Sequence, residues 1–264
     1  MNELARVIAE LTEGLAAGAS LLVLTDYDGT LTPLVGDPTA ARLEAEVLEN
    51  LRLLARSPRT RIGILSGRAL RDLRARVGVP EVIYAGCHGL EVEGPDISFR
   101  HPEAEAQGET LKAVTRVLGL HAGSIPGARL EPKGLAVAVH YRTVPPGAVA
   151  RLQAQVERTI REQGSRLQIL RGHKVMEILP RVRWNKGDCA LWIRDQVLLR
   201  LPPLLMMLYM GDDWTDELAF QALSGKAITV RVGSAWARSS AVYQFHEVAD
   251  VHRLLSALTA IPLH

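Results

Sequence analysis

The chain has 264 residues, of which 47% are hydrophobic and 23% are charged, a composition typical of a folded globular protein. Its 31 Lys and Arg against 29 Asp and Glu give a net charge of +2, which argues against a nucleic-acid groove or an acidic tail. The length exceeds that of one minimal domain, so we expect a core domain with an insertion.

The cysteines and the apolar segments indicate in which cellular compartment the protein is expected. Cys87 and Cys189 are far apart and lack metal-ligand spacing, which predicts a reducing compartment without a disulfide framework. Residues 1–18 lack the basic segment and cleavage site of a secretion signal. The longest apolar run, residues 201–210, contains two prolines and has about half the length of a membrane span. We expect a cytoplasmic monomer that binds neither membrane nor nucleic acid.

The first third of the chain alternates predicted helices and strands. Helices are expected over 2–17, 38–55 and 69–77, and strands over 21–24, 61–65 and 82–85. Such alternation with short connections indicates an α/β fold with a doubly wound parallel sheet. The arginine-rich run from Arg68 to Arg76 has helical spacing, which favours a solvated helix face over a nucleic-acid patch.

The pattern changes after Gly86 and resumes near residue 183. Between them we expect a hairpin over 90–99, helices over 103–118 and 146–163, a strand over 135–141 and two strands within 167–179. This α+β pattern predicts a cap domain over 96–182. The remaining elements are helices over 186–195, 214–223 and 247–259 and strands over 204–210 and 227–232. They complete a core made of 1–95 and 183–264.

Two aspartates follow the first predicted strand. Asp26 and Asp28 precede a Gly-Thr turn, and alternate residues of an extended segment share a side. Both carboxylates therefore lie where parallel sheets form binding crevices. Such a pair suits a hard cation such as Mg²⁺, or a division of labour between a nucleophile and a proton carrier. The alternative is an ordinary Asx turn that ends a strand.

Ser66 precedes a predicted helix, and Lys186 stands at the start of another. Ser66 follows a strand, where free backbone N–H groups and the helix dipole favour an anion; the alternative is a simple helix N-cap. Lys186 lies in a Trp-Asn-Lys-Gly-Asp segment, where its ammonium can hold a transferring phosphoryl group. The alternative is an exposed surface lysine.

Three carboxylates, those of Asp212, Asp213 and Asp216, follow an apolar run within a Gly-Asp-Asp-Trp-Thr-Asp segment. They too lie at the carboxyl end of a predicted strand and can form a cation site. The alternative is an acidic first turn of the next helix, with an aspartate as its cap.

In chain order the four segments resemble the motifs of the haloacid-dehalogenase superfamily of phosphohydrolases, and the resemblance covers the whole core. It implies that Asp26 is a nucleophile forming an aspartyl-phosphate, and that Asp28 is the general acid for the leaving alkoxide and then the base for water. It implies that Mg²⁺ is held by Asp26, the backbone carbonyl of Asp28, and Asp212.

The same resemblance gives four further residues a role. Ser66 and Lys186 are expected to clamp the phosphate, Asp213 to reach the metal through water, and Asp216 to orient Lys186. Asp28 and Ser66 are only 38 positions apart, whereas Ser66 and Lys186 are 120 positions apart. The insertion therefore follows the second motif, which argues against phosphomutase-like members.

Polar residues cluster in three segments of the second third of the chain, within 86–91, 131–142 and 173–180. With the Trp-Asn-Lys-Gly segment they resemble trehalose-6-phosphate phosphatases over nearly the whole chain. The alternative is salt bridging at the rim of the cap. The resemblance implies these substrate contacts: Arg68, His88, Glu91, Glu131, Lys133, Arg142, Lys174 and Glu177.

The combined expectation is a Mg²⁺-dependent phosphatase that acts on trehalose 6-phosphate. One alternative keeps the chemistry and changes the substrate to glucosylglycerate, mannosylglycerate or sucrose phosphate. The other is a phospho-accepting or sugar-phosphate-binding regulatory domain without turnover. The cap and the intact Asp28 favour turnover.

Overall fold

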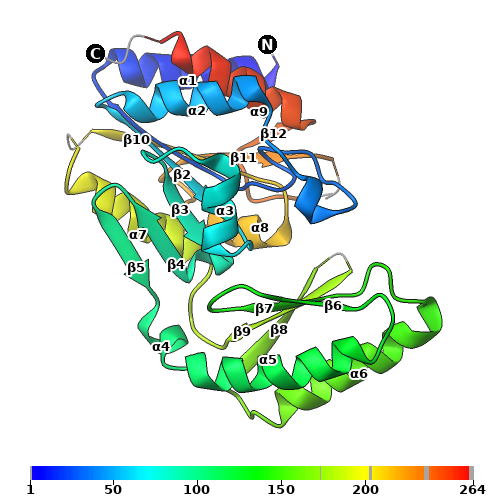
Figure 1. Cartoon of the computed structure of the whole chain (residues 1–264). Coiled ribbons are helices and arrows are strands. Elements are labelled where there is room, and N and C mark those ends of the chain that lie inside the picture. The colour runs from blue at the N-terminus through cyan, green and yellow to red at the C-terminus, as the bar shows by residue number, and fades with distance from the viewer. Residues whose placement is uncertain (1, 173, 202–203, 235–237, 262–264) are drawn as a thin grey trace.

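The computed structural model describes residues 2–172, 174–201, 204–234 and 238–261. Within these residues the strands form two sheets, each covered by helices (Figure 1). We call them the large-sheet unit and the small-sheet unit. The large-sheet unit contains β1 (Ser20–Thr25), β2 (Thr60–Leu65), β3 (Ile83–Gly86), β4 (Glu91–Gly94), β5 (Ile97–Arg100), β10 (Leu205–Gly211), β11 (Ile228–Val232), β12 (Tyr243–Phe245), α1 (Glu3–Ala16), α2 (Ala45–Arg56), α3 (Leu70–Val77), α7 (Lys186–Leu198), α8 (Trp214–Ala222) and α9 (Val248–Thr259).

The large sheet has the order β12-β11-β10-β1-β2-β3-β4-β5, and only β4 and β5 run antiparallel to their neighbours. Every residue of β1 is buried, as a strand covered on both faces requires. Thr25 at its end lies opposite Met210 of β10 and Ile64 of β2. Three neighbouring strands therefore end at one edge, and the loops after them share one space.

Helices cover both faces of this sheet. Leu21 and Val23 pack with α1, α2, α3 and α9, whereas Leu22 and Leu24 pack with α7 and α8. The predicted doubly wound α/β fold is thus confirmed. None of the helices in the described ranges combines the length and apolar character that a membrane crossing would need.

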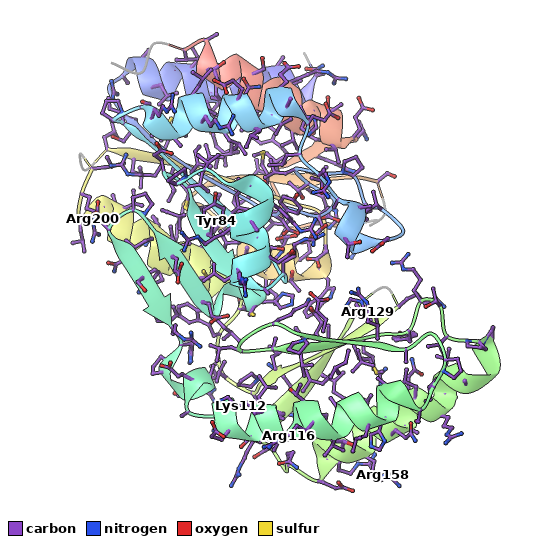
Figure 2. All side chains as sticks on the ribbon, viewed as in Figure 1. Tyr84, Lys112, Arg116, Arg129, Arg158 and Arg200 are labelled. Atoms are coloured by element: carbon purple, nitrogen blue, oxygen red, sulfur yellow. The ribbon has the colours of Figure 1, made fainter. Side chains whose placement is uncertain are left out.

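The small-sheet unit lies beneath the large one in Figure 1. Its antiparallel sheet has the order β6-β7-β9-β8 and the helices α5 and α6 on one face. Figure 2 shows Lys112 and Arg116 of α5 and Arg158 of α6 on the outer side of these helices, where they are exposed. The unit contains β6 (Arg129–Pro132), β7 (Val137–His140), β8 (Leu167–Gly172), β9 (Val175–Pro180), α5 (Gly108–Gly123) and α6 (Pro146–Arg161), after the short α4 (Pro102–Glu105).

Alternation along β7 and β9 gives the small sheet two different faces. Val137, Val139, Met176 and Ile178 are fully buried against α5 and α6. Glu177, between two of these residues, lies on the opposite face with Ala138 as its cross-strand partner. That polar face turns toward the carboxyl ends of the large sheet.

Two predicted helices differ from the structure. The helix expected over 38–55 is a 3₁₀ turn over 38–40 followed by α2, because tertiary bonds occupy the backbone between them. The carbonyl of Ala41 accepts a 2.8 Å hydrogen bond from Arg76 rather than one from the next turn. The helix expected over 103–118 is divided into α4 and α5, and the His101 side chain caps α4.

The strand predictions need two corrections. The strands β6 and β12 were not predicted, because both are short and because β6 contains Pro132, a residue type confined to edge strands or bulges. The predicted hairpin over 90–99 is present as β4 and β5. Both strands extend the large sheet, so the predicted boundary at residue 96 falls inside that hairpin.

Candidate active site

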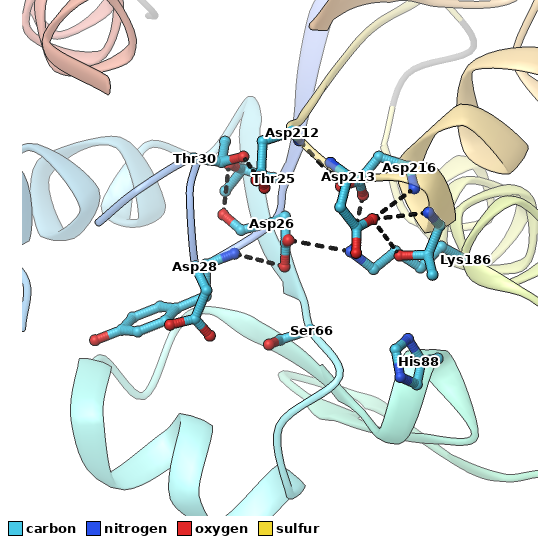
Figure 3. Close-up of polar contacts among 12 residues, drawn as sticks. Thr25, Asp26, Asp28, Thr30, Ser66, His88, Lys186, Asp212, Asp213 and Asp216 are labelled. Carbon is cyan, nitrogen blue, oxygen red and sulfur yellow. Dashed lines mark hydrogen bonds and ion pairs between the residues drawn. The ribbon is translucent and has the colours of Figure 1, made fainter. Parts of the chain in front are cut away.

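Asp26 lies directly after β1, at the edge where the parallel strands end. Its Oδ1 accepts a 2.7 Å hydrogen bond from the backbone N–H of Tyr27, and its Oδ2 lies 3.1 Å from Nζ of Lys186 (Figure 3). Burial raises the pKa of Asp26 well above its ordinary value, although Lys186 opposes the shift and nearby carboxylates add to it. A cation beside Asp26 would therefore favour the ionised form.

Lys186 is the first residue of α7 and is almost fully buried, which rules out the exposed surface lysine. Asn185 caps the helix and forms a capping box with Asp188, so the position of Lys186 is fixed by its neighbours. Its ammonium lies 2.8 Å from Oδ1 of Asp216. Although burial opposes it, Asp216 and Asp26 raise the pKa of Lys186 well above its ordinary value.

Asp213 and Asp216 cap a helix, as the alternative interpretation expected, and they also lie within the candidate site. They form the capping box of α8, in which Asp213 accepts hydrogen bonds from Thr215 and Asp216. Asp216 has no exposed surface, and its second oxygen accepts backbone N–H groups of Asp212 and Asp213, each at 3.1 Å. Tyr209 donates to the same oxygen as Lys186. Both oxygens of Asp216 are thus occupied.

Carboxylate oxygens of Asp26, Asp212 and Asp216 lie within 4.8 Å of one another. Because both oxygens of Asp216 accept hydrogen bonds from other donors, Asp26 and Asp212 are the two residues of this group that could hold a cation. Burial, followed by the charges of Asp216 and Asp213, raises the pKa of Asp212 to about 8. Two carboxylates whose ionised forms lack sufficient positive charge nearby are suitable ligands for a hard divalent cation such as Mg²⁺.

The turn after Asp28 allows Asp212 to approach this closely. Gly29 has a φ of +86°, and a Cβ at this position would lie 2.1 Å from Oδ2 of Asp212. Any other side chain would displace that carboxylate. Thr30 donates to Oδ1 of Asp212 at 3.3 Å and so orients it from the same turn.

Arg231, on β11, is a site residue that the sequence analysis missed. It is buried, donates to the backbone carbonyl of Asp212, and lies 3.1 Å from Glu217. Because a single arginine in a strand carries no pattern of its own, only the pairing of β11 with β10 reveals this contact.

Asp28 and Arg68 form a bidentate ion pair. Nε and Nη2 of Arg68 each lie 2.6 Å from an oxygen of Asp28, and Nη1 lies 2.9 Å from Asp72. Arg68 is buried, so the expected solvated helix face is wrong for this residue, and its guanidinium lies over the ring of Tyr27. Its contact with a substrate stays a prediction.

Ser66 follows β2 but does not cap a helix. The helix α3 begins at Leu70 with Ala69 as its N-cap, close to the expected start at residue 69, so the alternative that Ser66 is an N-cap is wrong. The Ser66 hydroxyl instead accepts the backbone N–H of Arg68 at 3.2 Å. Figure 3 shows it pointing to the side of the site that carries Asp28. A hydroxyl in this loop can still donate to a bound phosphate oxygen.

Glu177, Lys133 and His88 form a largely buried network between the two units. Oε1 of Glu177 accepts a hydrogen bond from Lys133, and Oε2 lies 2.6 Å from Nε2 of His88. Lys133 also donates to the carbonyl of Gly67 at 3.0 Å. Despite burial, Lys133 and His88 lower the pKa of Glu177 well below its usual range. The network joins the small sheet to the loops after β2 and β3.

The other predicted substrate contacts are more dispersed. Glu131 lies 2.6 Å from His140, a partner that the sequence analysis did not single out. Glu91 lies 3.2 Å from Arg100. Arg142 and Lys174 are both exposed, at the end of the small sheet away from Lys133. His173, in the third polar segment, lies outside the described residues.

A cavity of about 810 Å³ lies between α3 and the β6–β7 turn. Glu91, Glu131 and Lys133 line it together with Asp72, the second carboxylate partner of Arg68. Three of the predicted substrate contacts therefore share one cavity.

Comparison with known proteins gives a consistent result. Residues 24–250 match the family model of trehalose-phosphatase. The trehalose-phosphate phosphatase of Mycobacterium tuberculosis H37Rv is 38% identical over 224 residues, which are 84% of this chain and 56% of the relative. The chain thus spans about half the length of the curated relatives that it matches.

Solved structures agree with the fold. The C-terminal domain of Candida albicans trehalose-6-phosphate phosphatase aligns with a TM-score of 0.74 and 25% identity, covering 97% of each chain. A trehalose-6-phosphate phosphatase related protein aligns with a TM-score of 0.78 and 21% identity, covering 90% of this chain and 96% of that one.

Proposed function

The chain belongs to the trehalose-phosphatase family, and we propose that it hydrolyses trehalose 6-phosphate to trehalose and phosphate. The observation that carries this proposal is the largely buried cluster of Asp26, Lys186 and Asp212 at the carboxyl edge of the parallel sheet, opposite the polar face of the small sheet. A phosphoryl group held there would have its sugar directed toward Glu177.

In the first half of the proposed reaction, an oxygen of Asp26 attacks phosphorus. The bond from phosphorus to the ester oxygen breaks, and the leaving alkoxide takes a proton from Asp28. Lys186 lies 3.1 Å from Asp26 and would neutralise the phosphoryl oxygens, while the Ser66 hydroxyl would donate to one of them. Asp216 keeps the Lys186 ammonium in place through its 2.8 Å contact.

In the second half, water attacks the aspartyl-phosphate and gives its proton to Asp28, which restores Asp26 and releases phosphate. In the structure both oxygens of Asp28 accept a hydrogen bond of 2.6 Å from Arg68. To serve the leaving group and then water, one of these bonds has to be exchanged for a bond to the reacting oxygen. We therefore propose that the Asp28 side chain changes its hydrogen-bond partners during turnover.

The residues fit a bound Mg²⁺. Asp26 and Asp212 would hold it, with the backbone carbonyl of Asp28 as a third ligand implied by the family resemblance. When bound, the ion would balance the charge of the carboxylates and phosphate oxygens. Asp213, held as the cap of α8, would support this loop from the side of Asp216.

We further propose that the small-sheet unit is the substrate-recognising cap. Because β5 belongs to the large sheet, this cap begins after Arg100 and ends near Val182. A monomer suffices for this chemistry because every group named here comes from one chain. Both cysteines are free and buried, which agrees with a reducing compartment such as the cytoplasm.

The direct test is phosphate release from a panel of substrates. We expect trehalose 6-phosphate to give the highest kcat/KM, ahead of sucrose 6-phosphate, glucosylglycerate phosphate and mannosylglycerate phosphate, with activity lost in excess chelator. A higher kcat/KM for another member would change the substrate and keep the chemistry. Absence of phosphate release from the whole panel would contradict the phosphatase assignment.

A further inference from the structure

A second cavity, of about 420 Å³, lies between the two units beside the candidate active site. Gln168, Leu170 and Leu179 line it from the small sheet, and Lys186 and Trp214 line it from the starts of α7 and α8. Its volume lies within the range of small-molecule sites, and its lining joins apolar side chains to a few polar ones.

The cavity adjoins the reacting groups. Lys186 lines it and lies 3.1 Å from Asp26, the proposed nucleophile. His88 lines it and lies 2.6 Å from Glu177 of the polar network. A substrate whose phosphoryl group is held at Asp26 therefore has this cavity within reach of its remaining atoms.

Two tryptophans border the cavity, and they differ in their contacts. Trp184 donates its indole N–H to the carbonyl of Gly89 at 2.8 Å and stacks on Phe99 with ring centroids 5.1 Å apart. Trp214 is the first residue of α8 and is 37% exposed. In the described part of the chain its ring has no hydrogen bond and no aromatic partner. Trp184 is thus held in place by its neighbours, whereas the exposed ring surface of Trp214 is available to contact a ligand.

His88 adds a polar group with unused capacity. Its backbone has φ +59° and ψ 30°, a conformation that costs energy for a residue other than glycine. Nε2 of His88 is occupied by Glu177, at 2.6 Å, whereas its buried Nδ1 has no hydrogen-bond partner among the described residues. A ligand hydroxyl would satisfy it.

We propose that this cavity is the subsite for the sugar ring that carries no phosphate, with Trp214 as the platform for the apolar face of that ring. The proposal rests on the proposed function, since it assigns the second ring of the same disaccharide phosphate. A neutral ring fits better than a second phosphate, because Asp26 and Asp216 already balance the charge of Lys186.

The test compares two substrates that share the phosphorylated ring, trehalose 6-phosphate and glucose 6-phosphate, in Trp214→Ala and Trp214→Phe. Loss of the indole should lower the ratio of the two kcat/KM values, disaccharide over monosaccharide, about tenfold, whereas Phe should keep it within about threefold. Leu199→Ala, at an exposed side chain beyond the end of α7, is the control and should leave the ratio unchanged. Circular dichroism confirms that each variant is folded.

Binding gives a second measurement. Trehalose should change the tryptophan fluorescence of the wild-type protein, and Trp214→Phe should lose most of that change while it still binds trehalose in calorimetry. Equal losses of kcat/KM on both substrates, or an unaltered fluorescence response in Trp214→Phe, would overturn the subsite. A wild-type protein that fails to hydrolyse trehalose 6-phosphate but hydrolyses other sugar phosphates would instead overturn the substrate assignment on which the subsite rests.

Discussion

The carboxylate of Asp28 and the guanidinium of Arg68 are joined by two hydrogen bonds of 2.6 Å, although the residues lie 40 positions apart in the chain. Asp72 lies 2.9 Å from the same guanidinium, so Arg68 is itself held from the first turn of α3. The orientation of the proposed acid and base thus depends on a residue of another loop.

Substitution Arg68→Lys should lower kcat for trehalose 6-phosphate about tenfold, because one ammonium cannot hold both oxygens of Asp28 in a planar fork. Steady-state kinetics with Arg52→Lys on the surface of α2 as the control checks this expectation. An unchanged kcat in Arg68→Lys would show that the bidentate pair is unimportant for turnover.

Substitution Asp26→Asn should abolish turnover, because a neutral amide neither attacks phosphorus nor balances a cation. Asp28→Asn should be severely impaired and should accumulate phosphoenzyme, which mass spectrometry of the quenched protein can detect. If Asp26→Asn kept more than about one hundredth of the wild-type kcat, the nucleophile assignment would be wrong.

Asp212 and Asp216 should separate metal binding from stability. Asp216→Ala leaves the buried Lys186 with one partner fewer, which we expect to cost about 3–5 kcal/mol and to lower Tm even in chelator. In chelator at neutral pH the Asp212 carboxyl, with a pKa of about 8, is mostly protonated, so Asp212→Ala should leave Tm near that of wild type, while Mg²⁺ activation is lost. Thermal melting with and without Mg²⁺ checks both. Equal effects of the two substitutions would contradict this division.

The metal-free protein should lose stability as the pH rises. Asp212 has a pKa of about 8 in the folded chain, above its ordinary value, so its contribution to stability is present at low pH and is lost as the pH passes about 8. Mg²⁺ would compensate the ionised form, so the rise in Tm on adding Mg²⁺ should be larger at about pH 9 than at about pH 6. Asp212→Asn should remove this difference. The same rise at both pH values in wild type would contradict the expectation.

The sequence could predict the groups that follow strands, because each lies within a contiguous segment. Asp26, Asp212 and Lys186 are brought together by the parallel register of β1 and β10 and by the capped start of α7. The contacts of Arg231 and Tyr209 were not predictable in this way. Each is a single polar residue in a buried strand, and its partner is known only once the strands and α8 are in place.

In the small-sheet unit, too, the contacts between polar residues could not be predicted from the sequence. The alternation around Glu177 predicts a strand with one polar position, but it does not say which partners that carboxylate has. Its partners come from segments 44 and 89 positions away. The Glu131 and His140 pair arises from the register of β6 on β7, and β6 itself was missed. Residue types could be assigned to the cap from sequence, whereas their pairing could not.

Glu177 should recognise the sugar by hydrogen bonding to its hydroxyl groups. Its carboxylate contacts Lys133 and His88 on the polar face of the small sheet. A sugar hydroxyl can donate to the same oxygens, and charge-assisted bonds of this kind contribute about 1.5–3 kcal/mol each. Glu177→Gln keeps the shape and removes the charge, so it should lower kcat/KM for trehalose 6-phosphate about ten- to a hundredfold.

The control substrate for Glu177→Gln is p-nitrophenyl phosphate, which has no sugar hydroxyl to offer. We expect its hydrolysis to depend on Asp26, Asp28 and the phosphate-binding residues Ser66 and Lys186. The factor by which its kcat/KM falls should therefore be about ten times smaller than the factor for trehalose 6-phosphate. Binding energy from the sugar also helps to bring the two units together and exclude water, so kcat for trehalose 6-phosphate should fall along with affinity. The same loss on both substrates, with folding confirmed by circular dichroism, would mean that Glu177 only positions Lys133 and His88.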